Sequence, residues 1–151
     1  MSETARIADQ LRRAFSGAAW HGDSLSKILK GVTAKQAAAH PIKNAHSIWE
    51  LVLHIAAWDG AVRRRLGGNA VALSGERNFP PVADTSESAW RKALEHGKQA
   101  HDELVAAVSA VPDSRLEERV PGKKHDLYRM LHGVVQHELY HAGQIALLKK
   151  M

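Results

Sequence analysis

The sequence contains no cysteine, and this absence excludes several kinds of site. A chain without thiols forms no disulfide framework, no cysteine-based zinc knot and no iron–sulfur cluster, and it has no cysteine nucleophile. Any metal that this chain binds must therefore use nitrogen or oxygen ligands.

Long apolar runs are missing as well. No uninterrupted apolar stretch approaches the roughly 20 residues that a membrane-spanning helix needs. The N-terminal stretch MSETARIADQLRR carries charges throughout and lacks the apolar core of a secretory signal. We therefore expect a cytoplasmic protein with no membrane partner.

The composition is that of an ordinary globular protein. The chain has 151 residues, of which 44% are hydrophobic and 25% charged, so we expect one domain with one core over residues 1–151. The net charge of +5 suggests nucleic acid at first, but lysine and arginine are scattered among acids. The densest basic run, Arg63-Arg64-Arg65, is better explained as a solvated helix end, and no nucleic-acid partner is expected.

Apolar periodicity predicts four long helices and no strand. A capping box of Ser47 and Glu50 predicts the start of the second long helix, and Gly67-Gly68 its end. Ser24 and Thr33 are each expected to cap a short helix before it. The predicted long helices cover about 2–18, 47–66, 84 or 85 to 111, and 124–126 almost to 151. This pattern indicates an all-α helical bundle, whose interior can build metal and ligand sites, and the short helices disfavour a simple up-and-down chain.

Ten histidines are the unusual feature of the composition. His137 and His141 are four residues apart, and a helical projection places them within about 60° of the apolar Met130, Val134 and Leu148. Burying two imidazoles side by side is costly unless their nitrogens find partners. A shared cation would satisfy them, and so would hydrogen bonds between two core residues.

A third histidine favours the cation. His54 lies at the edge of the apolar stripe of the second long helix, beside Leu51 and Trp58. Three inward histidines on two helices would leave an open coordination position, which is typical of catalytic rather than structural metals. The sequence thus predicts a divalent metal site formed by His54, His137 and His141.

The run His137-Glu138-Leu139-Tyr140-His141 also matches HExxH, the zinc-protease pattern in which the glutamate is the general base. In those proteases the third ligand lies well downstream, whereas residues 142–151 contain no His, Asp or Glu. Protease activity is therefore disfavoured. Glu138 is expected to be an exposed or helix-flanking carboxylate, and it stays a weak catalytic candidate.

Several motifs together resemble the DinB-like superfamily over nearly the whole chain. They are the run SIWELVLH ending at His54, the late His137-xxx-His141-x-Gly143-Gln144, and the turn Trp20-His21-Gly22. The resemblance implies a four-helix bundle with a long crossover, zinc or nickel on the three histidines, and frequently a homodimer. It does not imply DNA binding. Characterised relatives include metal-dependent transferases that use low-molecular-weight thiols such as mycothiol or bacillithiol, and other members are described only as hydrolases. The resemblance therefore implies a small-molecule substrate and one of these two reactions.

Four further residues are candidates for the pocket or for support behind the ligands: Trp20, His21, Trp58 and Gln144. His21 is also a weak candidate for an acid, a base or an extra ligand. Each has a plainer explanation, since Trp58 can be core, Gln144 can cap a carbonyl, and Trp20-His21 can pin the loop. The other histidines are expected at the surface, namely His40, His46, His96, His101, His125 and His132.

Two other functions stay open at this point. The chain could sequester a metal or small ligand without turnover, which the lack of an obvious acid or base supports. It could also be a bundle that dimerises or contacts nucleic acid through its basic surface, with vestigial histidines.

Overall fold

The computed structural model describes residues 1–151 as an all-helical protein without strands. The predicted all-α class is confirmed. None of the helices combines the length and the apolar character needed to cross a bilayer. The elements are α1 (Glu3–Phe15), α2 (Leu25–Leu29), α3 (Ala34–Ala38), α4 (Ile48–Leu66), the 3₁₀ turn η1 (Gly75–Arg77), α5 (Glu87–Ala110), the 3₁₀ turn η2 (Asp113–Arg115) and α6 (Leu127–Leu148).

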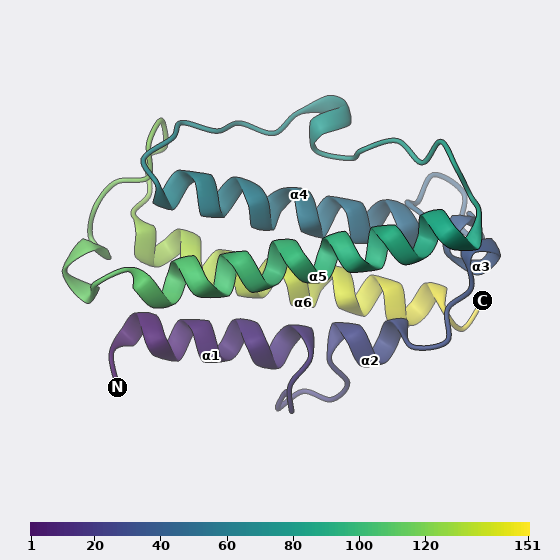
Figure 1. The fold of residues 1–151 in the computed structure, drawn as a ribbon, viewed down its shortest axis with the longest axis horizontal. Helices are drawn as coiled ribbons and strands as arrows, with labels where there is room; N and C mark the ends of the chain where they lie inside the picture. Colours follow the sequence, from purple (N-terminus) through teal and green to yellow (C-terminus); the bar gives the residue numbers. More distant parts are fainter.

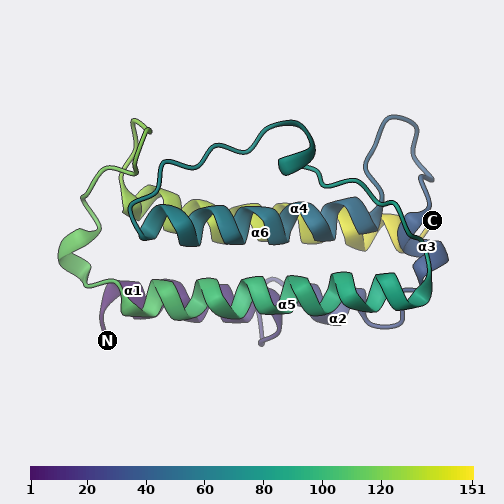
Figure 2. The ribbon, with the colours of Figure 1, turned by 45° about the horizontal axis from the view of Figure 1, so that its top comes forward.

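The four long helices form a bundle in which α4 and α1 each pack against both α5 and α6 (Figure 1). The short α2 continues roughly along the line of α1. Helices α1 and α6 run in one direction and α4 and α5 in the other. Because α4 and α5 are parallel, the segment 67–86 must travel the length of the bundle, and it does so over the outside of α4 (Figure 2). This is the predicted bundle with a long crossover and short helices in its connections.

Local hydrogen bonds explain where the long helices begin. The Ser47 hydroxyl accepts from the Glu50 N–H at 3.2 Å, and the Glu50 carboxylate accepts from the Ser47 N–H at 2.8 Å, as the capping box predicts. For α5 the predicted start at residue 84 or 85, with Asp84 or Thr85 as the cap, was early by one or two residues. Ser86 caps the helix, and the Asp84 carboxylate instead accepts from the Ser86 N–H at 2.9 Å.

A layer of three buried polar residues divides the core into two apolar clusters. One cluster joins α1 to the C-terminal halves of α4 and α5 and the first half of α6, and the other joins α2 and α3 to the opposite halves. Asp59, His101 and Glu138 lie between them, and each is at most 2% exposed. His101 Nδ1 is 3.5 Å from a Glu138 oxygen and 3.9 Å from an Asp59 oxygen. None of their side-chain oxygens and nitrogens makes a protein hydrogen bond.

This polar layer corrects two sequence-based expectations. Glu138 is 0% exposed and is not a surface carboxylate, and His101 is 2% exposed and is not a surface histidine. Helix α6 contacts α1 as well as α4, so its buried face is wider than the single stripe that contains His137 and His141. His101 lies three residues before buried Leu104, so the apolar periodicity of α5 already contained the information that it faces inward.

The polar layer should make the stability of the fold depend on pH. Burial raises the pKa of Asp59 well above its usual range, and the Glu138 carboxylate raises it further. The folded state therefore holds a proton that the unfolded chain releases. The bound proton contributes fully to folding stability below the ordinary aspartate pKa. This contribution is lost as the pH rises through the raised pKa of Asp59 in the folded state.

Asp59→Asn removes the charge while it keeps the shape of the protonated carboxyl. We expect the variant to have a higher free energy of unfolding than the native protein at about pH 8, and the difference to shrink towards about pH 5. Urea unfolding at both pH values measures this. If Asp59→Asn instead lowers the free energy of unfolding equally at both pH values, Asp59 is ionised in the folded protein and stabilised by His101.

Candidate metal centre

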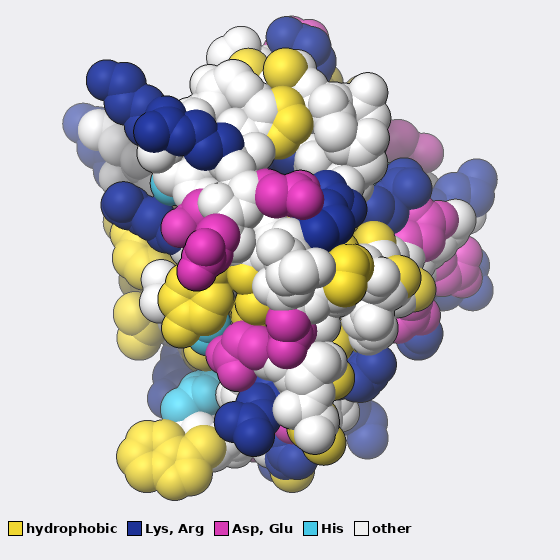
Figure 3. Space-filling model, turned by 90° about the vertical axis from the view of Figure 1, so that its left-hand side faces the viewer, with side chains coloured by type: hydrophobic (Ala, Val, Ile, Leu, Met, Phe, Trp, Pro, Cys, Tyr) yellow, Lys and Arg dark blue, Asp and Glu magenta, His cyan; other side chains and the backbone are white.

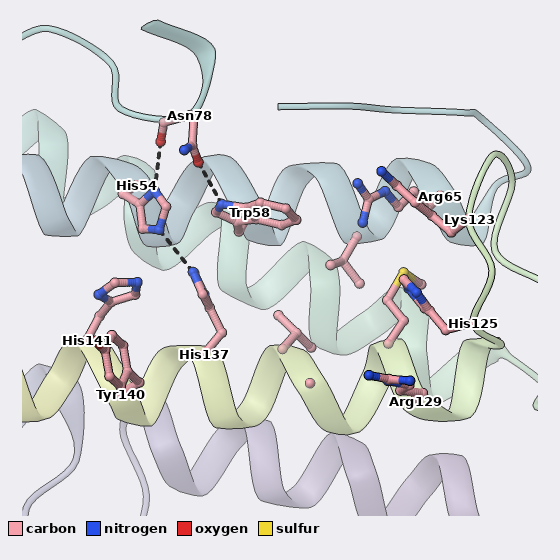
Figure 4. Close-up of a pocket in the computed structure, with 14 residues that line it drawn as sticks. His54, Trp58, Arg65, Asn78, Lys123, His125, Arg129, His137, Tyr140 and His141 are labelled. Atoms are coloured by element: carbon pink, nitrogen blue, oxygen red, sulfur yellow. Dashed lines mark hydrogen bonds between the residues drawn. The ribbon is translucent and has the colours of Figure 1, made fainter. Parts of the chain in front are cut away.

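The structure brings His54 of α4 together with His137 and His141 of α6 (Figure 4). One nitrogen from each ring lies within 4.8 Å of the other two. The Nε2 atoms of His54 and His137 are 3.0 Å apart. In a tetrahedral zinc site, bonds of roughly 2.0–2.1 Å place neighbouring ligand atoms about 3.4 Å apart. The three rings could therefore hold a divalent ion after small side-chain adjustments.

Two of the rings have their orientation fixed by a partner behind them. His54 Nδ1 donates to the Asn78 carbonyl at 2.8 Å, and His141 Nδ1 donates to Gln144 Oε1 at 2.6 Å. Donation from Nδ1 leaves the Nε2 lone pair free, and such partners commonly orient histidines that bind metals. His137 differs, because its Nδ1 is buried without a hydrogen-bond partner.

The surroundings keep all three imidazoles neutral. Burial, together with the neighbouring His141 and His54, lowers the pKa of His137 to about 3. Burial also lowers the pKa of His54 and of His141. Near neutral pH the rings are therefore uncharged, and only the exchangeable N–H of a neutral imidazole has to be displaced for a metal ion to bind.

The crossover segment completes this part of the site. The Phe79 ring stacks on His54 with centroids 4.0 Å apart, and the Trp58 Nε1–H donates to Asn78 Oδ1 at 2.9 Å. Sequence reasoning identified Trp58 but missed Asn78 and Phe79. They follow η1 in a loop without periodicity, so their approach to His54 depends on the path of the crossover.

The other two candidate residues lie elsewhere. Trp20 is fully exposed and His21 is exposed, in the connection between α1 and α2. That connection projects from the side of the bundle opposite the crossover, and neither residue lines the cleft beside the three histidines (Figure 2). The structure therefore does not bring the Trp20-His21 turn to the predicted metal site.

A cleft of about 630 Å³ extends from the three histidines along the groove between α4 and α6. Its middle is lined by Trp58, Val62, Met130 and Val134. The Tyr140 ring lies 5.1 Å from that of His141, and it also lines the cleft. No aspartate or glutamate does so, because Glu138 points into the polar layer. The arrangement of a zinc protease, with a glutamate beside the metal, is therefore absent.

Comparison with known families agrees with this geometry. The family model described as the DinB superfamily matches residues 18–145. The chain belongs to the DinB superfamily. The match includes α4, α5 and most of α6, and hence His54, His137 and His141. No curated protein and no solved structure matches the chain.

The contact behind His141 gives a test of the site. Gln144→Ala removes the acceptor of the His141 Nδ1–H and should weaken zinc binding by about ten- to a hundredfold, the usual effect of losing such a partner. Competition with a chromophoric chelator measures the affinity. The exposed Gln136→Ala on the same helix is the control. Equal affinities in the two variants would show that Gln144 does not orient the ligand.

Proposed function

We propose that this DinB-superfamily protein is a metal-dependent enzyme acting on a small molecule, as a hydrolase or as a transferase of a low-molecular-weight thiol. The metal is a single zinc or nickel ion bound by His54, His137 and His141. The observation that carries the proposal is the opening of three neutral imidazoles, two of them oriented by a hydrogen bond from Nδ1, into one cleft. Three protein ligands leave a coordination position for water or substrate.

In this proposal the residues of the site have different roles. A divalent ion held there would act as a Lewis acid that activates water or a thiol. The apolar side chains of Trp58, Val62 and Val134 would bind the substrate and exclude water from the groove. Tyr140 supplies an O–H group in the cleft beside His141. We assign no carboxylate base, because none lines the cleft.

A second function, sequestration of a metal or small ligand without turnover, is favoured by the absence of a carboxylate from the lining of the cleft. A cleft without a carboxylate has no evident general base, and a binding protein needs none. A homodimer and a cytoplasmic location remain part of the proposal, and light scattering of the purified protein tests the former.

Activity measurements separate the two functions. Zinc- and nickel-loaded protein is assayed against esters, amides, phosphate esters and electrophiles, the last with and without mycothiol or bacillithiol. The enzyme proposal expects turnover of at least one class, and a loss of at least about a hundredfold in kcat/KM in His141→Ala. The exposed His96→Ala is the matched control. A fully loaded protein that is inactive across the panel would support sequestration instead.

A further inference from the structure

The end of the cleft opposite the three histidines is lined by cationic or basic side chains. Arg65 comes from the end of α4, Arg129 from the first turns of α6, and Lys123 and His125 from the loop that precedes α6. Figure 4 shows these four residues grouped at one end of the groove and the histidine cluster at the other. Figure 3 looks at the molecule from this end, and lysine and arginine side chains gather at its upper left.

No acidic residue forms an ion pair with the cationic side chains at this end of the cleft. No aspartate or glutamate lines the cleft. Other lysines and arginines of the chain form ion pairs, but Arg65, Lys123 and Arg129 form none. Asp126 is close in sequence, and its carboxylate caps α6 by accepting from the Arg129 backbone N–H at 2.8 Å without forming an ion pair with these side chains. Arg65, Lys123 and Arg129 therefore line the cleft without a direct ion-pair partner in the protein.

Arg65 shows that this end is more than a solvated surface patch. It is only 4% exposed, and its guanidinium carbon lies 5.3 Å from the centre of the Trp58 ring. Its Nε and Nη2 atoms donate to the Val71 carbonyl at 3.0 and 2.7 Å, and Nη1 makes no hydrogen bond within the protein. A buried positive charge without a counter-ion costs free energy, which a bound anion would offset.

We propose that the cationic end binds a carboxylate or phosphate group of the substrate, and that the substrate is an elongated anion whose opposite end reaches the histidines. This inference rests on the proposed function. Arg129 and His137 are eight residues apart on α6, so the two ends are separated by about 12 Å along the helix. The middle of the cleft is apolar, and the part of the substrate between its two ends is accordingly apolar.

Two hydroxamates test this proposal with zinc-loaded protein. The mono-hydroxamate of octanedioic acid carries a metal-binding group at one end and a carboxylate at the other, and octanohydroxamic acid has a methyl group in place of the carboxylate. Calorimetry at low ionic strength is expected to show about tenfold tighter binding of the carboxylate-bearing probe, as one charge-assisted contact provides. The double variant Lys123→Gln/Arg129→Gln should lose this advantage. The control Lys124→Gln/Arg6→Gln, which changes exposed residues outside the cleft, should keep it.

A second measurement separates failure of this proposal from failure of the metal site. Metal-free protein is titrated with octanoate and with neutral octanamide. A preference for octanoate that disappears in Lys123→Gln/Arg129→Gln supports the anion site even if zinc is not retained. Equal affinity for the two hydroxamates and for octanoate and octanamide would overturn the anion site, while zinc-dependent binding of the hydroxamates would leave the metal site supported.

Discussion

His137→Ala should release the metal from the protein. The native chain is expected to retain about one zinc or nickel ion, because three imidazoles converge on one space. Removing one of them leaves two ligands, and the affinity should fall by at least about a hundredfold, since even the loss of a residue behind a ligand costs ten- to a hundredfold. Elemental analysis of the untagged protein after gel filtration measures the metal content.

The control for this experiment is His132→Ala, which changes a half-buried histidine on the same helix outside the cleft. Its metal content should equal that of the native chain. Circular dichroism must show that His137→Ala keeps its helices. A folded variant that retains as much metal as the native protein would show that His137 is not a ligand.

His101→Ala should be the most destabilising of the substitutions considered. The imidazole stacks on Phe15 with ring centroids 4.2 Å apart, and it is the only basic group beside the carboxyls of Asp59 and Glu138. Its removal leaves a cavity and two buried carboxyls without their imidazole neighbour. The cavity and the loss of the polar neighbour together should cost about 3–5 kcal/mol. Denaturant unfolding measures the loss.

Two comparisons identify the cause of that loss. His96→Ala, an exposed position on the same helix, should change the free energy of unfolding by no more than about 0.5 kcal/mol. Near neutral pH, Asp59→Asn should change the free energy of unfolding by a different amount in the His101→Ala background than in the native protein, since His101 lies beside the Asp59 carboxyl. If Asp59→Asn changes the free energy of unfolding equally in both backgrounds, the polar layer is not a coupled unit.

Much of the fold could be predicted from local patterns. The capping box at Ser47 and the three- and four-residue apolar spacing determine where α4 begins and which face it buries. The same projection identified His54, His137 and His141, which the structure brings together. These features depend on neighbours within one or two turns, and such neighbours are readable in sequence.

The errors arose where a contact depends on the tertiary arrangement of the chain. Glu138 was expected outside the core because only the stripe containing His137 was counted, whereas α6 also packs against α1. Asn78 and Phe79 could not be predicted because a loop of this length has many possible paths, and its contact with His54 depends on the tertiary arrangement. The exposed Trp20 was placed near the site by resemblance, without any spacing argument.

The most direct test of the metal centre is X-ray absorption at the metal edge of zinc-loaded protein. We expect three imidazole nitrogens at about 2.0–2.1 Å and at least one further light ligand from solvent or substrate. In His54→Ala the spectrum should show fewer imidazoles or no bound zinc. A shell of oxygen ligands alone, or a spectrum identical in native and His54→Ala protein, would contradict the three-histidine site.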